Sequence, residues 1–505
     1  MNNTRNKTRK WFGRDESREV VRDEIRSGTT SKTDRRMMSA SDASGSAFRS
    51  RTVHGRGSGA ASSRPLSARS VAASLAGLIG LSVAAWGSAA SAQADEAVRP
   101  ALASASTVAS ASLTSASGAF SQQVTASKYA TASKQTIVSK HSAPSKQAGK
   151  SKAAERRDVK ATIQTLVDNG YPGALAAKTD KDGNTVGATA GKGNLATGEA
   201  PPLDGEVRIG SNTKTFVAVV IMKMVEEGKV KLDEPIETYL PGLIKGQGVD
   251  GKKITVRQLL QHTSGLPETA LGFPDVFASR NNYYQPRDIL DEALTKAAQF
   301  APGAKFTYTN TNYIVLGLLA ERVAKRPIAE QIETKIVKPL GLKHTYMPKD
   351  GEKALRGKHP RGYHTRDNKP GKLVDITDYD TSMAWTAGAM VSTPSELNKF
   401  MQSIFDGSLL NQASISEMKK SVPMGDDGNV YGLGLIGHKL SCGVAWGHGG
   451  TFPGYQTDNA VGPDGTAAVI ATTAIPSANA KDTAAGKAGE KLLGLQALDR
   501  AVCGK

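Results

Sequence analysis

The sequence lacks several patterns that would assign a function at once. No cluster of His, Cys and Asp has the spacing of a zinc site, and no glycine-rich phosphate loop follows a predicted strand. No Asp-His pair stands near a Gly-x-Ser-x-Gly elbow, the motif of the common serine hydrolases. We therefore expect no metal ion, no nucleotide or other cofactor, and no Ser-His-Asp triad.

The sequence also lacks a long apolar run. Its apolar stretch at residues 71–87 is short and diluted by Ala and Gly, which argues against a permanent transmembrane helix. Arginines precede this stretch and the small-residue site Ala92-Gln93-Ala94 follows it, which is the plan of a signal peptide. We expect residues 71–94 to direct export, so that the mature, secreted chain begins at Asp95. An uncleaved membrane anchor is the alternative.

Cysteine is scarce as well, with only Cys442 and Cys503 in the chain. Both fall in the part that we expect to be exported, where disulfides persist, so an even number fits one disulfide. The bond would join a turn just before the strand that carries His448 to the C-terminal end. Two free buried thiols are the alternative.

Positive charge is abundant but unevenly placed. The chain has 65 Lys and Arg against 47 Asp and Glu, a net charge of +18. Residues 1–70 contribute +9 (16 basic against 7 acidic), and residues 71–156 contribute +5 (8 against 3). Only +4 is left for residues 157–505, so the charge gives no support for a nucleic-acid partner of that part.

The N-terminal third has no pattern typical of a folded core. Residues 1–70 are polar and rich in Arg and Ser, so we expect a disordered basic leader. Residues 95–156 consist mostly of Ser, Ala, Thr, Lys and Gln, the composition of a flexible linker. The lysines spaced along this linker indicate either simple solvation or attraction to an anionic cell-wall polymer.

Residues 157–505 are long enough to bury a large core. Strand signals occur near both ends of this part, at 174–178, 186–190, 443–447, 456–461 and 467–474. Helical signals fill the middle and are also present at 158–169 and 484–498. We predict an α+β fold in which both ends contribute strands to one sheet and a helical region is inserted between them.

A first candidate for catalysis is Ser211-x-x-Lys214, at the start of an apolar run. If this run is a helix that ends at Gly228, Ser211 lies in its first turn and Lys214 lies over the same face. The helix N-terminus and the amine would then favour ionisation of a serine nucleophile. The spacing alone is weak, because Ser416 and Lys419 repeat it in an ordinary polar stretch.

Two later motifs extend this pattern. They are Tyr308-Thr309-Asn310 and Gly447-His448-Gly449-Gly450-Thr451. Together with Ser-x-x-Lys, and in this order, they resemble the three signature elements of the serine β-lactamase and penicillin-binding family. The phrases Gln261–Pro267 and Tyr431–Leu435 match the same family. The resemblance covers about residues 157–505 and is closest to secreted Streptomyces D-alanyl-D-alanine carboxypeptidases and class C β-lactamase-like serine hydrolases.

The resemblance implies a fold and a catalytic centre. The fold would be an antiparallel sheet flanked by helices plus an all-helical lobe, with the site at their junction. Ser211 would be the nucleophile, and Lys214 and Tyr308 would handle its proton, with the formal base left open between them. Lys214 would also hold the phenolic oxygen of Tyr308.

The resemblance also implies how a substrate is bound. Asn310 would hydrogen-bond the substrate amide, and His448, Gly450 and Thr451 would line the substrate site. The backbone N–H groups of Ser211 and Thr451 would form the oxyanion hole. We expect a small peptide, β-lactam or ester as the substrate, and a monomeric protein.

Two departures from the carboxypeptidase pattern limit the expected specificity. Ile436 stands where those relatives have an arginine that binds the peptide carboxylate, and Gly449 stands where they have a threonine. We therefore expect weak turnover of D-alanyl-D-alanine peptides with a free carboxylate, while β-lactam, ester and D-amino-acid amide hydrolysis stay open. A module that is acylated without turnover and a structural, wall-anchored protein are the alternatives from other classes.

Overall fold

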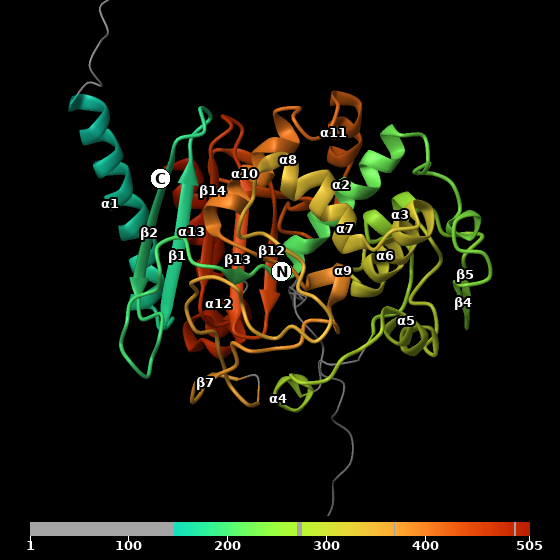
Figure 1. Ribbon diagram of the computed structural model, residues 1–505, viewed down its shortest axis with the longest axis horizontal. Helices are drawn as coiled ribbons and strands as arrows, with labels where there is room; N and C mark the ends of the chain where they lie inside the picture. Colours follow the sequence, from blue (N-terminus) through green and yellow to red (C-terminus); the bar gives the residue numbers. More distant parts are fainter. Residues whose placement is uncertain (1–145, 270–274, 368, 489–490, 505) are drawn as a thin grey trace, which may run out of the picture. The chain divides into compact units, whose positions relative to one another are not determined.

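The computed structural model describes residues 146–269, 275–367, 369–488 and 491–504 (Figure 1). Its main feature is an eight-stranded antiparallel sheet with the strand order β2-β1-β14-β13-β12-β11-β10-β9. The strands are β1 Gly173–Thr179, β2 Thr185–Gly191, β9 Val422–Pro423, β10 Val430–Tyr431, β11 Ile436–Leu440, β12 Gly443–Phe452, β13 Tyr455–Val461 and β14 Ala467–Thr472. Because β1 pairs with β14, strands from both ends of the domain meet inside one sheet. The predicted α+β fold is confirmed.

Both faces of the central strands are buried by helices. Along β1, Leu175 faces one hydrophobic cluster, while its neighbours Ala174 and Ala176 face the other. This is the period-2 alternation of a strand that is covered on both sides. Helices α1 (Lys146–Asp168) and α13 (Leu493–Cys503) pack on one face, and α10 (Pro394–Phe405) packs on the other (Figure 1).

The helical region is built around α2 (Thr213–Glu226), in which every residue from Thr213 to Met222 is buried. A helix that is apolar all round must be surrounded by other elements, and α6 (Asn310–Ala324) and α10 supply much of this shell. The other helices of this part are α3 Val256–Leu260, α4 Val276–Ser279, α5 Pro286–Leu294, α7 Ile328–Ile332, α8 Lys338–Leu340, α9 Trp385–Gly388 and α11 Gln412–Lys419.

Several boundaries differ from the sequence-based expectations. Helix α1 begins at Lys146, inside the segment that we predicted to be a linker up to residue 156, because the Ala-, Lys-, Glu- and Arg-rich residues there favour a helix. The single helix predicted at 484–498 is wrong. The chain forms α12 (Ala480–Ala488) and then α13, and a carboxylate oxygen of Asp482 accepts the Leu493 N–H at the start of α13.

The predicted leader, the signal peptide and most of the linker lie outside the described residues. Within the described part of the chain, no helix combines the length and apolarity that crossing a membrane requires.

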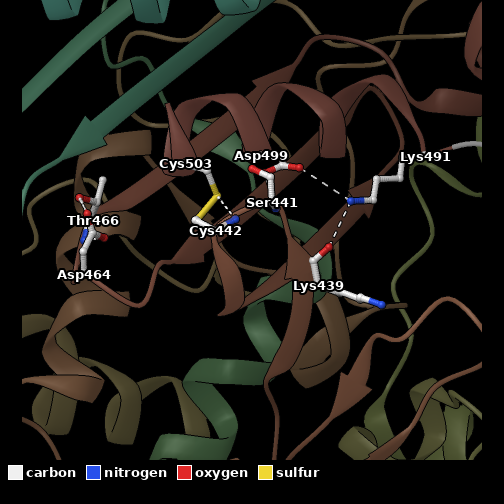
Figure 2. The surroundings of a disulfide bond; sticks show 8 residues. All are labelled: Lys439, Ser441, Cys442, Asp464, Thr466, Lys491, Asp499 and Cys503. Carbon is white, nitrogen blue, oxygen red and sulfur yellow. Dashed lines mark hydrogen bonds and ion pairs between the residues drawn. A yellow bond between two sulfur atoms is a disulfide. The ribbon is translucent and has the colours of Figure 1, made fainter. Parts of the chain in front are cut away.

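A disulfide joins Cys442 to Cys503, with 5.4 Å between their Cα atoms (Figure 2). It connects the turn between β11 and β12 to the last turn of α13. Polar contacts lie beside the bond, since the Asp499 carboxylate accepts hydrogen bonds from the Ser441 N–H at 2.9 Å and from its hydroxyl at 2.8 Å. The strand that carries His448 is therefore fastened at its start to the helix layer on the far face of the sheet.

We predict that Cys442→Ser lowers the free energy of unfolding without changing the chemistry at Ser211. The cysteines are 61 residues apart, and closing a loop of this size restricts the unfolded chain by roughly 4 kcal/mol. Denaturant unfolding measures the loss, and covalent labelling of Ser211 measures the chemistry. Cys503→Ser is the matched control: it should cause the same loss, and the double variant should lose no more than either single variant. Two alkylatable thiols in the native protein would contradict the prediction.

Candidate active site

Ser211 lies in a 3₁₀ turn, Gly210–Asn212, that leads directly into α2. Gly210 has a φ of +51°, which favours glycine, and its lack of a side chain permits a close approach. A Cβ atom at Gly210 would lie 2.6 Å from the Thr451 carbonyl oxygen and 2.8 Å from the Thr451 nitrogen. The sequence therefore brings the backbone of the nucleophile turn against the backbone of β12.

Lys214 is fully buried directly behind Ser211. Its Nζ lies 3.1 Å from Ser211 Oγ, 2.8 Å from Asn310 Oδ1 and 2.7 Å from the Ala387 carbonyl oxygen. Burial lowers the pKa of Lys214 from 10.5 to about 7, although the negative charge of Glu268 opposes the shift. A large fraction of Lys214 is therefore neutral near pH 7.

The neutral amine fits this set of partners. Its two N–H groups can donate to the oxygens of Asn310 and Ala387, which only accept, and its lone pair is then left for the Ser211 hydroxyl. Asn310, which we predicted to bind the substrate amide, thus contacts Lys214 in the structure. The geometry makes Lys214 the group placed to take the Ser211 proton.

Tyr308 lies just before α6, and its hydroxyl oxygen is buried without a hydrogen bond in the described structure. Burial raises its pKa, and the nearby Ser211 hydroxyl weakly opposes this rise. Lys214 Nζ lies over the Tyr308 ring, 4.8 Å from its centre, and forms no hydrogen bond with the phenolic oxygen. The expected bond from Lys214 to that oxygen is therefore not made. A protonated Tyr308 beside Ser211 is placed to donate a proton.

Strand β12 provides the opposite wall of the site. Its pairing with β11 stops at Gly447, while its pairing with β13 continues to Phe452. Beyond Gly447 the nucleophile turn packs against β12, and a Cβ atom at Gly450 would lie 1.9 Å from the Ile209 carbonyl oxygen. The N–H groups of Ser211 and Thr451 thus belong to two backbones in contact, as an oxyanion hole requires.

His448 is only 1% exposed and faces the helical region rather than solvent. Its Nε2 lies 2.9 Å from the Tyr431 hydroxyl, and its ring centre is 6.2 Å from that of Tyr308. Burial and the charge of Lys214 lower its pKa to about 3. His448 therefore lies beside Tyr308, as predicted, but as a neutral side chain.

Glu268 is a site residue that the sequence analysis missed. One carboxylate oxygen accepts the Asn310 N–H at 2.6 Å and the other accepts the Thr269 N–H at 3.2 Å. Burial raises its pKa to about 7, and its charge acts on both Lys214 and Tyr308. Its only sequence signal was its position directly after the family-like phrase Gln261–Pro267.

Within the described residues, no group of three or more His, Cys, Asp and Glu side chains could hold a metal ion. A serine at a helix start, a buried neutral lysine and a tyrosine facing them define a serine acyl-transfer hydrolase. The chain belongs to the β-lactamase family, whose model, described as Beta-lactamase, matches residues 159–491. The recognised resemblance to the serine β-lactamases and penicillin-binding proteins is thereby confirmed.

Curated relatives match only part of their own length. A putative penicillin-binding protein of Bacillus subtilis (strain 168) is 29% identical over 265 residues, which is 52% of this chain and 60% of the relative. Protein flp of Staphylococcus aureus (strain MW2) is 31% identical over 186 residues, 37% of this chain and 36% of the relative.

Two solved structures match over nearly their whole length. A D-stereospecific amidohydrolase from Streptomyces sp. is 31% identical, with a TM-score of 0.60, and the match covers 66% of this chain and 99% of that one. A D-amino acid amidase from Ochrobactrum anthropi SV3, complexed with L-phenylalanine, is 26% identical with a TM-score of 0.61. That match covers 69% of this chain and 98% of the amidase.

We predict that Ser211→Ala abolishes covalent labelling by a fluorophosphonate or a β-lactam while the fold stays intact. The reason is that acylation needs this one oxygen, whereas the half-buried Ser211 side chain contributes little to packing. Lys214→Ala and Tyr308→Phe should each slow labelling by about 100-fold or more, without adding up, because the three side chains act as one unit. Intact-mass spectrometry followed over time measures the rates.

Ser416→Ala is the matched control. Ser416 has the same spacing to a lysine, but it is exposed on α11 and its hydroxyl donates to the Gln412 carbonyl oxygen at 2.8 Å. The rate of Ser211 labelling in Ser416→Ala should equal that of the unmodified protein. Labelling that survives in Ser211→Ala, or is lost in Ser416→Ala, would refute the assignment of the nucleophile.

Proposed function

We propose that the protein is an exported serine hydrolase that forms an acyl-enzyme on Ser211 and cleaves amides, small peptides or esters whose acyl group carries a free amino group. The observation that carries the proposal is the Glu268 carboxylate beside the catalytic residues. Two solved neighbours, described as a D-stereospecific amidohydrolase and a D-amino acid amidase, support the amide class and the D configuration.

The reaction follows from the contacts of Lys214 and Tyr308. Ser211 Oγ attacks the substrate carbonyl as its proton passes to Lys214 Nζ, 3.1 Å away. The N–H groups of Ser211 and Thr451 hold the oxygen that becomes negative. Tyr308 donates its proton to the leaving nitrogen or oxygen, and the proton held by Lys214 returns to Tyr308 through a water molecule, because the two groups share no direct hydrogen bond. Water then attacks the acyl-enzyme, and the same groups return their protons in the reverse order.

Glu268 favours a positively charged group on the acyl side of the substrate. The Glu268 carboxylate accepts two backbone N–H groups and a hydrogen bond from the Asn310 side chain, which leaves about one of its roughly four lone-pair sites for a substrate. A substrate ammonium near it would favour the ionised carboxylate, because an opposite charge lowers the pKa that burial has raised to about 7. An α-amino group fits this requirement, since it lies next to the carbonyl that Ser211 attacks.

A D-alanyl-D-alanine carboxypeptidase is the second candidate, supported by the family motifs and by the B. subtilis relative described as a putative penicillin-binding protein. Two residues of strands β11 and β12 argue against carboxypeptidase activity. Ile436, only 7% exposed, pairs with Gly447 and offers no positive charge. Gly449 has no side chain and therefore lacks the hydroxyl that would bind a peptide carboxylate.

The sequence also supports a proposal for where the protein acts and what it binds. The apolar stretch and small-residue site at residues 71–94 support export, and the lysine-rich segment up to residue 156 supports attraction to an anionic wall polymer. A protein that is acylated without turnover is the remaining alternative, and release of product beyond one equivalent per chain excludes it.

We predict that Glu268→Gln separates substrates with a free amino group from those without one. For a D-amino acid amide, kcat/KM should fall by about 10- to 100-fold, because a charge-assisted hydrogen bond contributes about 1.5–3 kcal/mol. The N-acetylated form of the same amide is the control substrate and should change by less than about threefold relative to the unmodified enzyme. Equal losses on both substrates would mean that Glu268 acts only on Lys214, and the proposed preference would be wrong.

We also predict that Ile436→Arg raises kcat/KM for peptides that end in a free D-alanine carboxylate. A guanidinium there would form a charge-assisted contact, again about 1.5–3 kcal/mol. The matching D-alanine amide peptide, which lacks the carboxylate charge, should not gain. An unchanged or lower rate on the carboxylate peptide would show that Ile436 does not face the leaving group.

A further inference from the structure

A chain of hydrogen bonds runs behind the catalytic residues, from the segment that carries Tyr308 to strand β12. The Thr309 N–H donates to His262 Nδ1 at 3.2 Å, and His262 Nε2 lies 3.2 Å from the Tyr431 hydroxyl. That hydroxyl lies 2.9 Å from His448 Nε2, and His448 Nδ1 lies 2.5 Å from the Gly449 carbonyl oxygen. The three side chains are all buried.

The direction of this chain is fixed by its two ends. The Thr309 N–H can only donate, so His262 Nδ1 accepts and, in the neutral ring, Nε2 carries the proton. The amide of Asn312 donates to the same Nδ1 at 3.0 Å, because its Oδ1 accepts the Ser264 hydroxyl. At the other end the Gly449 carbonyl oxygen can only accept, so His448 Nδ1 carries the proton and its Nε2 accepts.

Tyr431 completes the chain by accepting from His262 and donating to His448. The Tyr313 hydroxyl donates to the Leu260 carbonyl oxygen at 3.0 Å, and its oxygen is also close enough to Tyr431 to be a second acceptor for the Tyr431 proton. With His448 neutral, its Nε2 receives the Tyr431 proton, whereas a protonated His448 would turn that proton towards the Tyr313 oxygen. When both rings are neutral, opposite tautomers on the two histidines satisfy every group of the hydrogen-bond chain. The lowered pKa values of His262 and His448 agree with it.

We propose that His262 and Tyr431 are positioning residues for acyl transfer, which act through a one-directional hydrogen-bond chain from Thr309 to Gly449. The proposal rests on the acyl-transfer role of Ser211. Thr309 is the residue after Tyr308, and Gly449 lies two residues before Thr451, so the chain ties the proton donor to the strand of the oxyanion hole. Tyr308 comes from the helical region and the Thr451 N–H comes from the sheet. The position of the one relative to the other decides how well the transition state is stabilised.

The first test uses the unmodified protein. Histidine-selective ¹⁵N labelling and ring ¹⁵N NMR distinguish the two neutral tautomers, and His262→Gln and His448→Gln assign the signals. His448 should carry its proton on Nδ1 and His262 on Nε2, with neither ring protonated between pH 5 and pH 9. The same tautomer on both rings, or a protonated ring in this range, would overturn the proposal.

The second test is Tyr431→Phe, which removes one oxygen. We expect the rate constant for β-lactam acylation of Ser211 to fall at least 10-fold, the non-covalent dissociation constant to change less than threefold, and the ¹⁵N signal of His448 Nε2 to shift, because this nitrogen loses its hydrogen-bond donor. Tyr455→Phe is the matched control, because Tyr455 is equally buried and its hydroxyl donates to the Pro360 carbonyl oxygen at 2.8 Å. It should leave the acylation rate and the His448 Nε2 signal unchanged.

The outcomes separate this proposal from the proposed function. Equal acylation rates in Tyr431→Phe and Tyr455→Phe would reduce the chain to a structural feature and overturn the proposal. No acylation of the unmodified protein would defeat the proposed function itself, and the positioning role with it, whatever tautomers are found. If Tyr431→Phe does not fold, the tautomers of the unmodified protein still decide whether the one-directional chain exists.

Discussion

The site depends on one constraint, which is the burial of the Lys214 amine. An exposed lysine would be protonated near pH 7 and could not accept a proton from Ser211. Full burial lowers its pKa to about 7. The acceptor oxygens of Asn310 and Ala387 take two N–H groups of the neutral amine and so direct its lone pair towards Ser211. The apolar surroundings of α2 are therefore a condition for the chemistry as well as for the stability of the fold.

The same constraint explains why the site lies where the two parts of the domain meet. Burying an amine deeply and still exposing the adjacent hydroxyl requires walls from several elements. Helices α2, α6 and α9, which contains Ala387, close the Lys214 side, and β12 closes the side of the oxyanion hole. The sheet is in turn completed by strands from both ends of the domain, so correct geometry at Ser211 requires the whole domain to be folded.

Sequence reasoning reached those parts of the site that local spacing determines. Ser211 and Lys214 are three residues apart at the start of one helix. The motifs that contain Tyr308 and His448 each resemble a signature motif of the family. It did not reach contacts set by tertiary packing, such as Lys214 with Asn310, 96 residues away. Glu268 was missed because one acidic residue in a loop has no periodicity, and β9 and β10 were missed because two-residue strands leave no alternation to detect. The tautomers of His262 and His448 depend on which atoms meet, which no sequence pattern specifies.

The contact between the backbones of Gly210 and Thr451, with Gly450 against Ile209, has a consequence for how such an enzyme changes over evolutionary time. The nucleophile turn meets β12 through main-chain atoms, and the buried Asn212 side chain holds the turn to Thr457 of the next strand. Ile436 and Gly449 make none of these contacts, so a substitution at either position can change how a substrate is bound while the approach of Ser211 to Thr451 is kept.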